Sequence, residues 1–175
     1  MRTNPPPGRP KEGSLPLGGK ARSAKGAHTS PRRRAREFVL QGLYQRQLSR
    51  NAHDAIRAQL AEAAGFAKAD EAYFDALWAG VTDEYDALVL LFAPDLDRRA
   101  AQLSPIERAI LVIGAWELQH RPEIPCRVVI NEAIELAKSY GGTDGHKFVN
   151  GVLDKLASTL RATEMDVLRH GAGTV

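Results

Sequence analysis

Hydrophobic residues recur every three to four positions from residue 32 almost to the C-terminus, which is the spacing of one face of an α-helix. Leu40, Leu43 and Leu48 form the first such stripe, after a Ser30-Pro31 start signal. No segment alternates apolar and polar residues over five or more positions, as a half-buried strand would. The pattern therefore predicts an all-α fold of about seven helices joined by short loops.

Capping residues, prolines and glycines set the expected helix boundaries. Asn51 or Asp54 is expected to cap the second helix, and Asp70 the third. Asp144 is expected to cap the helix that follows Gly141-Gly142. The segment from Ser104 to Glu107 has the pattern of a capping box, a strong start signal. We expect helices over 32–48, 51–65, 70–93, 104–120, 125–140 and 144–160, with a short one over 95–102 and a weak one over 164–169.

Charge divides the chain into a basic arm and a mildly acidic body. Residues 1–36 carry ten Lys and Arg and one acidic residue, which gives +9, while the remaining 139 residues carry 14 basic and 20 acidic side chains, which gives −6. Residues 1–31 hold six of the ten prolines and none of the aromatic residues. Such a segment buries too little apolar surface to offset its conformational entropy. We therefore expect a disordered basic tail over 1–31 and one helical domain over 32–170.

Several classes of protein are excluded by missing signals. The longest apolar run, Ala87 to Ala93, is far shorter than the roughly 18 residues of a membrane span. Cys126 is the only cysteine, so no internal disulfide forms. Glu132 and Glu135 share a helix face, but a carboxylate-bridged metal site requires Glu-x-x-His pairs from facing helices. Neither of these two glutamates is followed by a histidine three positions later, and Glu135 fits a surface pair with Lys138 better. We expect no metal, no cofactor, no small-molecule substrate and no catalytic site.

Four arginines, Arg32, Arg33, Arg34 and Arg36, crowd the start of the first helix. Each exposed cation there opposes the helix dipole by roughly 0.3–1 kcal/mol. Phosphates would remove that conflict, because guanidiniums and the free amides of the first turn both attract them. The alternative is a solvated, frayed basic end. The acidic body offers no basic recognition helix for duplex DNA, so single-stranded RNA is the favoured polyanion.

Three blocks of sequence resemble the NusB family of bacterial transcription antitermination factors. They are Arg32–Glu37 with Gln41–Tyr44, then Val129–Tyr140, and finally His146–Asp154. The resemblance covers about residues 31–162. The same domain precedes certain ribosomal RNA cytosine methyltransferases, but this chain reaches Val175 without a strand-rich extension, so we expect the free-standing factor.

The resemblance implies two small helical subdomains, no enzymatic activity and a cytoplasmic location. It also implies the partners: NusE, a protein of the small ribosomal subunit, single-stranded boxA RNA, and RNA polymerase with other Nus factors on ribosomal RNA operons. Carried over residue by residue, NusE contact falls on Glu107. RNA contact falls on Arg32, Arg33, Arg34, Arg36, Tyr44, Tyr140, Asp144, Lys147 and Phe148.

The sequence differs from the family pattern in two ways, and two other functions are alternatives to RNA binding with NusE. The basic tail is longer than the family usually has, and residue 140 is Tyr where members often carry Phe, which preserves stacking. Each of the three aromatic residues in the set is, taken alone, more often a core residue than a stacking platform. The alternatives are a helical protein-binding scaffold without RNA specificity of its own, whose arm meets an acidic partner, and an accessory domain of a methyltransferase system.

Overall fold

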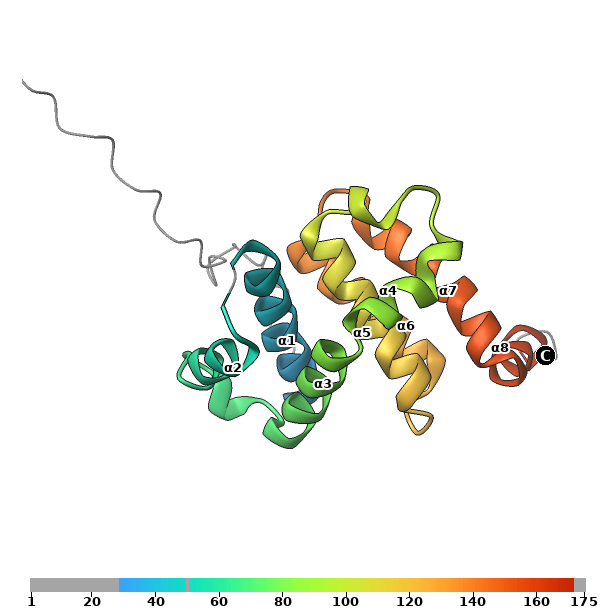
Figure 1. Ribbon diagram of the computed structural model, residues 1–175. Coiled ribbons are helices and arrows are strands. Elements are labelled where there is room, and N and C mark those ends of the chain that lie inside the picture. The colour runs from blue at the N-terminus through green and yellow to red at the C-terminus, as the bar shows by residue number, and fades with distance from the viewer. Residues whose placement is uncertain (1–28, 50, 172–175) are drawn as a thin grey trace, which may run out of the picture.

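The computed structural model describes residues 29–49 and 51–171, and within them the chain forms α-helices, short 3-10 turns and no strand (Figure 1). The α-helices are α1 Pro31–Leu48, α2 His53–Ala61, α3 Glu71–Asp83, α4 Tyr85–Phe92, α5 Pro105–His120, α6 Cys126–Tyr140, α7 Gly145–Leu160 and α8 Ala162–His170. The 3-10 turns are η1 Phe66–Lys68, η2 Ala93–Asp95 and η3 Ala100–Gln102. The predicted all-α fold is confirmed. What was expected of residues 1–28 lies outside the described residues.

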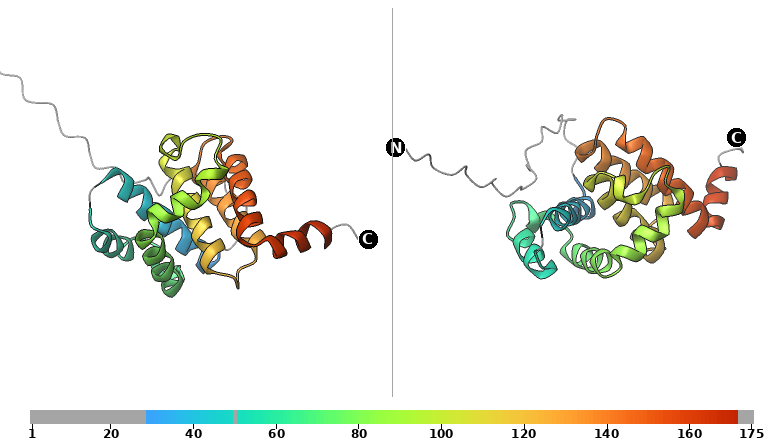
Figure 2. Two further views of the ribbon diagram at one scale, coloured as in Figure 1. Left: turned by 45° about the vertical axis from the view of Figure 1, so that its right-hand side comes forward. Right: turned by 45° about the horizontal axis from the view of Figure 1, so that its top comes forward.

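The helices form two groups that meet at α5. Helices α1, α2 and α3 pack together, α5, α6 and α7 pack together with α4 against them, and α8 lies beyond α7 at the far end (Figures 1 and 2). Helix α1 runs antiparallel to α5, because Arg36 meets Glu117 near one end and the Gln47 side-chain amide donates to the Pro105 carbonyl oxygen at 3.0 Å near the other. The end of α1 therefore lies beside the start of α5.

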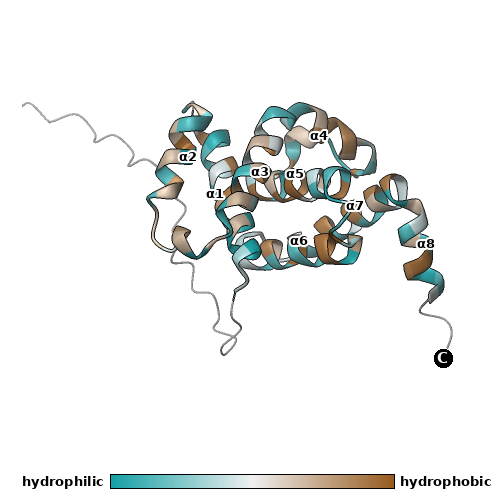
Figure 3. Cartoon of the chain, turned by 90° about the horizontal axis from the view of Figure 1, so that it is seen from below, coloured by the Kyte–Doolittle hydropathy of each residue, from teal (hydrophilic) through white to brown (hydrophobic). Residues whose placement is uncertain are grey.

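One hydrophobic core runs through both groups. It collects apolar side chains from α1 to α8, and brown and teal residues alternate around the helices as amphipathic packing requires (Figure 3). In the first group, Phe66 lies edge-on to Phe38 and Phe74, with ring centroids 5.1 and 5.0 Å apart. In the second, Ile110, Ile113 and Leu153 are almost completely buried. The two groups thus share one continuous core.

Three expected helix starts are confirmed in atomic detail. The Ser30 hydroxyl accepts from the Arg33 amide at 3.1 Å, and the Asp70 carboxylate accepts from the Tyr73 amide at 3.0 Å. The capping box at α5 is complete, because the Ser104 hydroxyl accepts from the Glu107 amide at 3.2 Å and the Glu107 carboxylate accepts from the Ser104 amide at 3.3 Å. These local signals fix where α1, α3 and α5 begin.

The expected single helix over 70–93 was wrong, because the chain breaks between α3 and α4. Glu84 leaves the helical conformation, with φ −105° and ψ 14°. Just before it, the Thr82 hydroxyl donates to the Trp78 and Ala79 carbonyl oxygens at 2.8 and 3.1 Å, a back-bonding pattern that bends helices. Hydrophobic residues continue at helical spacing across the break, so periodicity could not reveal it.

Other boundaries also differ from the expectation. The segment 95–102 forms no α-helix and instead holds the last residue of the 3-10 turn η2 and the whole of η3. Helix α2 ends at Ala61, well before Gly65, and its cap position is Ala52 without a side-chain bond, so neither Asn51 nor Asp54 caps it. Among the described residues, no helix combines the length and apolar character needed to cross a membrane.

Candidate nucleic-acid interface

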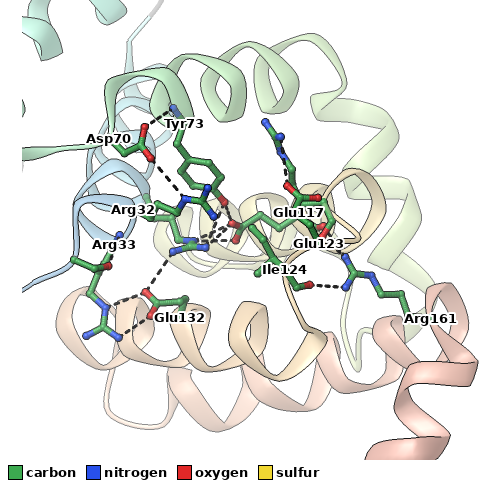
Figure 4. Close-up of polar contacts among 12 residues, drawn as sticks. Arg32, Arg33, Asp70, Tyr73, Glu117, Glu123, Ile124, Glu132 and Arg161 are labelled. Carbon is green, nitrogen blue, oxygen red and sulfur yellow. Dashed lines mark hydrogen bonds and ion pairs between the residues drawn. The ribbon is translucent and has the colours of Figure 1, made fainter.

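Arg36 lies in the interior. Its side chain is 3% exposed, and its Nε atom donates to both carboxylate oxygens of Glu117 at 2.9 and 3.1 Å. The Tyr73 hydroxyl donates to the same carboxylate, which is itself 1% exposed (Figure 4). Burial raises the pKa of Glu117, and the Arg36 guanidinium opposes that rise. The buried pair joins α1 to α5, and direct contact between Arg36 and RNA does not fit this position.

Arg33 is also paired within the molecule. Its Nε and Nη2 atoms donate to the two carboxylate oxygens of Glu132 at 2.9 and 2.8 Å, which ties α1 to α6 (Figure 4). The Glu132 Oε2 atom also lies 3.6 Å from Arg36 Nη1. Arg33 and Arg36 are therefore not the unfavourable exposed cations that the sequence analysis expected at the helix start, because carboxylates from distant helices neutralise them.

Arg32 and Arg34 keep surface that a ligand can reach. The Arg32 side chain is 54% exposed, lies 5.0 Å over the Tyr73 ring and makes only a long 3.6 Å approach to Asp70 (Figure 4). Arg34 has no carboxylate within 4.0 Å among the described residues, and its Nε atom is buried without a hydrogen-bond partner there. These two side chains are thus the open part of the arginine cluster.

Tyr140, at the end of α6, lies against the same side of α1. Burial raises its pKa, the Glu37 carboxylate raises it further and the Arg34 guanidinium lowers it, so charges near the start of α1 act on the Tyr140 hydroxyl. Tyr44 follows Glu37 by seven residues and therefore lies on the same face of α1, two turns along. Both tyrosines are half-buried. Tyr140 is thus within electrostatic reach of Glu37 and Arg34, and Tyr44 lies on α1 two turns beyond Glu37.

The start of α7 continues this surface. Asp144 and Lys147 are each 73% exposed and form an ion pair at 3.0 Å, and Asp144 makes no side-chain cap, contrary to the expectation. Phe148 is half-buried, with the Arg98 guanidinium 4.9 Å above its ring. A Cβ atom placed on Gly145 would lie 3.3 Å from Glu107 Oε1, so Glu107 adjoins the start of α7. The expected contact with NusE therefore borders the expected RNA contacts.

The structure also identifies residues that the sequence analysis missed. Glu37 is half-buried between Arg34 and Tyr140, where burial raises its pKa and the nearby guanidiniums of Arg34 and Arg33 lower it. Arg98 reaches Phe148 from an irregular segment, and the charge run Asp97-Arg98-Arg99 was its only sequence signal. The expected surface pair of Glu135 and Lys138 is present at 3.1 Å. No group of ligands suited to a metal ion occurs within the described part of the chain.

Comparison with known proteins adds independent information. Residues 33–158 match the NusB family. The chain is 55% identical over 146 residues to a transcription antitermination protein NusB of Ralstonia pickettii, covering 83% of this chain and 94% of that protein. It is 50% identical over 170 residues to the protein of that name from Cupriavidus pinatubonensis, covering 97% and 100%. Among solved structures, T. maritima NusB superposes with a TM-score of 0.69 at 28% identity, covering 79% of this chain and 99% of that one.

Proposed function

The chain belongs to the NusB family, and from this membership we propose that it binds boxA RNA together with NusE. It is a transcription antitermination factor, and its family is not enzymatic. In this proposal the protein acts in the cytoplasm, where it joins RNA polymerase and other Nus factors and supports processive elongation through ribosomal RNA operons.

The observation that carries the proposal is the meeting of the open arginines with aromatic residues from distant helices. The Arg34 guanidinium and the Glu37 carboxylate on α1 both act electrostatically on Tyr140 of α6, and Tyr44 lies two turns along α1 from Glu37. Single-stranded RNA is bound by cations that meet its phosphates and aromatic rings that stack on its bases. Arg32, Arg34 and Lys147 supply the first, while the proposed stacking residues are Tyr44, Tyr140 and Phe148, with Asp144 beside them.

Arg33 and Arg36 have a positioning role in this proposal. Their bonds to Glu132 and Glu117 hold α1 against α6 and α5, so that Arg34 keeps its place relative to Tyr140. A bidentate arginine–carboxylate pair fixes direction as well as distance. Of the two, only Arg33, with a side chain 35% exposed, can also reach a phosphate.

Glu107 can serve both its helix and a partner protein. Its Oε2 atom accepts from the Ser104 amide and hydroxyl at 3.3 and 2.9 Å, which completes the capping box. Its Oε1 atom accepts no hydrogen bond within the described residues and faces the start of α7. A basic or hydrogen-bond-donating side chain of NusE is the proposed partner of that free oxygen.

Fluorescence anisotropy with a labelled boxA oligonucleotide, with and without NusE, tests the proposal. The variant R34A/K147A removes two open cations and should flatten the dependence of log affinity on log salt by about 1.4, which is two contacts of 0.7 each. The control R127A/R169A removes two exposed cations from the start of α6 and from α8 and should leave that slope unchanged. RNA affinity that is absent with and without NusE would contradict the proposal and leave a protein-binding scaffold.

A further inference from the structure

The guanidinium of Arg98 covers the Phe148 ring, and Arg98 is not among the expected RNA contacts. The Arg98 Cζ atom lies 4.9 Å from the centroid of the Phe148 ring. Arg98 belongs to the segment between η2 and η3, whereas Phe148 lies in the first turns of α7. The Arg98 side chain is 47% exposed and the ring is half-buried. The contact is therefore on the surface, where a ligand can reach both groups.

The fold does not depend on this contact. The other partner of Arg98 is its neighbour Asp97, whose carboxylate oxygens accept from Nε and Nη2 at 2.7 and 3.1 Å. The Asp97 side chain is 65% exposed, and ion pairs at such positions contribute little to stability. A guanidinium over an exposed ring also gains little when water competes for it. The Arg98 side chain can therefore leave Asp97 and the Phe148 ring for another partner at a small cost in free energy.

The surroundings of the ring favour a phosphate. Lys147 precedes Phe148 in the chain and is 73% exposed. The first amides of α7 receive no side-chain cap. The Gly145 and Lys147 amides donate to the Gly142 and Asp144 carbonyl oxygens at 3.1 Å each, while the His146 amide has no partner among the described residues, and a free amide at a helix start attracts anions. Arg98 adds a planar guanidinium, which can grip a phosphate through two parallel N–H donors. A ring for a base, with Arg98 over it and Lys147 beside it in the chain for a phosphate, matches the chemistry of a nucleotide.

We propose that Arg98 and Phe148 together bind one nucleotide of the RNA. In the free protein the guanidinium covers the ring. In the complex a base stacks on that face of Phe148, and Arg98 turns to the phosphate beside the base. This inference rests on the RNA-binding function proposed above, and it adds the segment between η2 and η3 to the interface.

The test uses the full chain, NusE and a labelled boxA oligonucleotide over a series of salt concentrations. Arg98→Ala should weaken binding by about tenfold, because a charge-assisted hydrogen bond is lost. It should also reduce the salt slope by about 0.7, the value for one phosphate. Arg99→Ala is the matched control, because it removes the same charge from the next residue in the chain. The Arg99 side chain is exposed and lies over no aromatic ring of the described residues. It should leave both quantities nearly unchanged.

A double-variant cycle tests whether the two side chains act on one nucleotide. The loss in R98A/F148A should be clearly smaller than the product of the two single losses, as expected for coupled contacts. Thermal unfolding should be the same for R98A and the wild type, which separates binding from folding. Equal losses in R98A and R99A, an unchanged slope or tighter binding by R98A would overturn this inference alone. Wild-type protein that binds no RNA would overturn the proposed function and this inference with it.

Discussion

Replacing Arg36 with Met should destabilise the protein strongly, because it leaves a buried carboxylate without its cation. Arg36 and Glu117 are 3% and 1% exposed, and the guanidinium holds both carboxylate oxygens within 3.1 Å. Of the hydrogen bonds accepted by the Glu117 carboxylate, only the one from the Tyr73 hydroxyl would remain. Removing one partner of a buried ion pair typically costs about 3–5 kcal/mol. We expect a loss of that size in the free energy of unfolding at pH 7, measured by urea denaturation.

The raised pKa of Glu117 predicts how the stability loss caused by Arg36→Met changes with pH. Burial raises the pKa of Glu117 above its usual 4.5, so the folded state holds that proton more tightly than the unfolded state does. The stability contributed by this group is therefore complete below pH 4.5 and is lost as pH rises through the folded pKa. Without Arg36 the pKa rises further. The difference between Arg36→Met and the wild type should consequently shrink as the solution is acidified.

Two control variants separate the buried charge from other effects. Arg57→Met removes a guanidinium that is 34% exposed and paired with Asp75, and it should cost at most about 1 kcal/mol. The double variant R36M/E117Q removes both buried charges and should recover much of the stability. A loss below about 1 kcal/mol for Arg36→Met, or a difference that does not vary with pH, would refute the reasoning.

Three further predictions concern packing, reactivity and capping. Gly80→Ala places a Cβ atom 2.0 Å from Trp116 Nε1 and should lower the unfolding free energy by about 1–3 kcal/mol, and an unchanged midpoint in urea would contradict the packing. Burial and the hydrogen bond to Glu164 raise the pKa of the Cys126 thiol to about 11, so native protein should react with a disulfide reagent far more slowly at pH 8 than urea-unfolded protein, and equal rates would count against this. Ser104→Ala should cost about 1 kcal/mol in thermal or urea unfolding, whereas Ser104→Thr should cost less, and an equal effect of the two would remove capping as the cause.

Local signals in the sequence predict most helix starts, because a cap is made by residues three positions apart. The Ser104 and Glu107 pair illustrates this, since both of its bonds are present. The break at Glu84 could not be predicted in the same way. Leu88 and Phe92 remain buried beyond it, so the hydrophobic stripe continues while the backbone turns. Periodicity reports which face is buried, not whether the helix is continuous.

The residues of the candidate site come from the sequence, whereas the ion pairs and ring contacts among its residues could not be predicted from it. Helical spacing and the family resemblance indicated Arg34, Tyr140 and Phe148. The partners of Arg33 and Arg36 lie 99 and 81 positions away along the chain, and no local pattern connects them. The interaction of Arg98 with Phe148 likewise depends on how a loop folds over α7. Long-range pairs of this kind follow from tertiary packing alone.

Amide hydrogen exchange with and without a boxA oligonucleotide, in the presence of NusE, tests the central claim most directly. We expect protection on RNA binding in residues 32–44 and 140–148, where the open arginines, the two tyrosines and the start of α7 lie. Protection of both segments would show that α1 and the start of α7 bind RNA as one surface. RNA binding that leaves both segments unprotected, with protection confined to α2 or α8, would contradict the account.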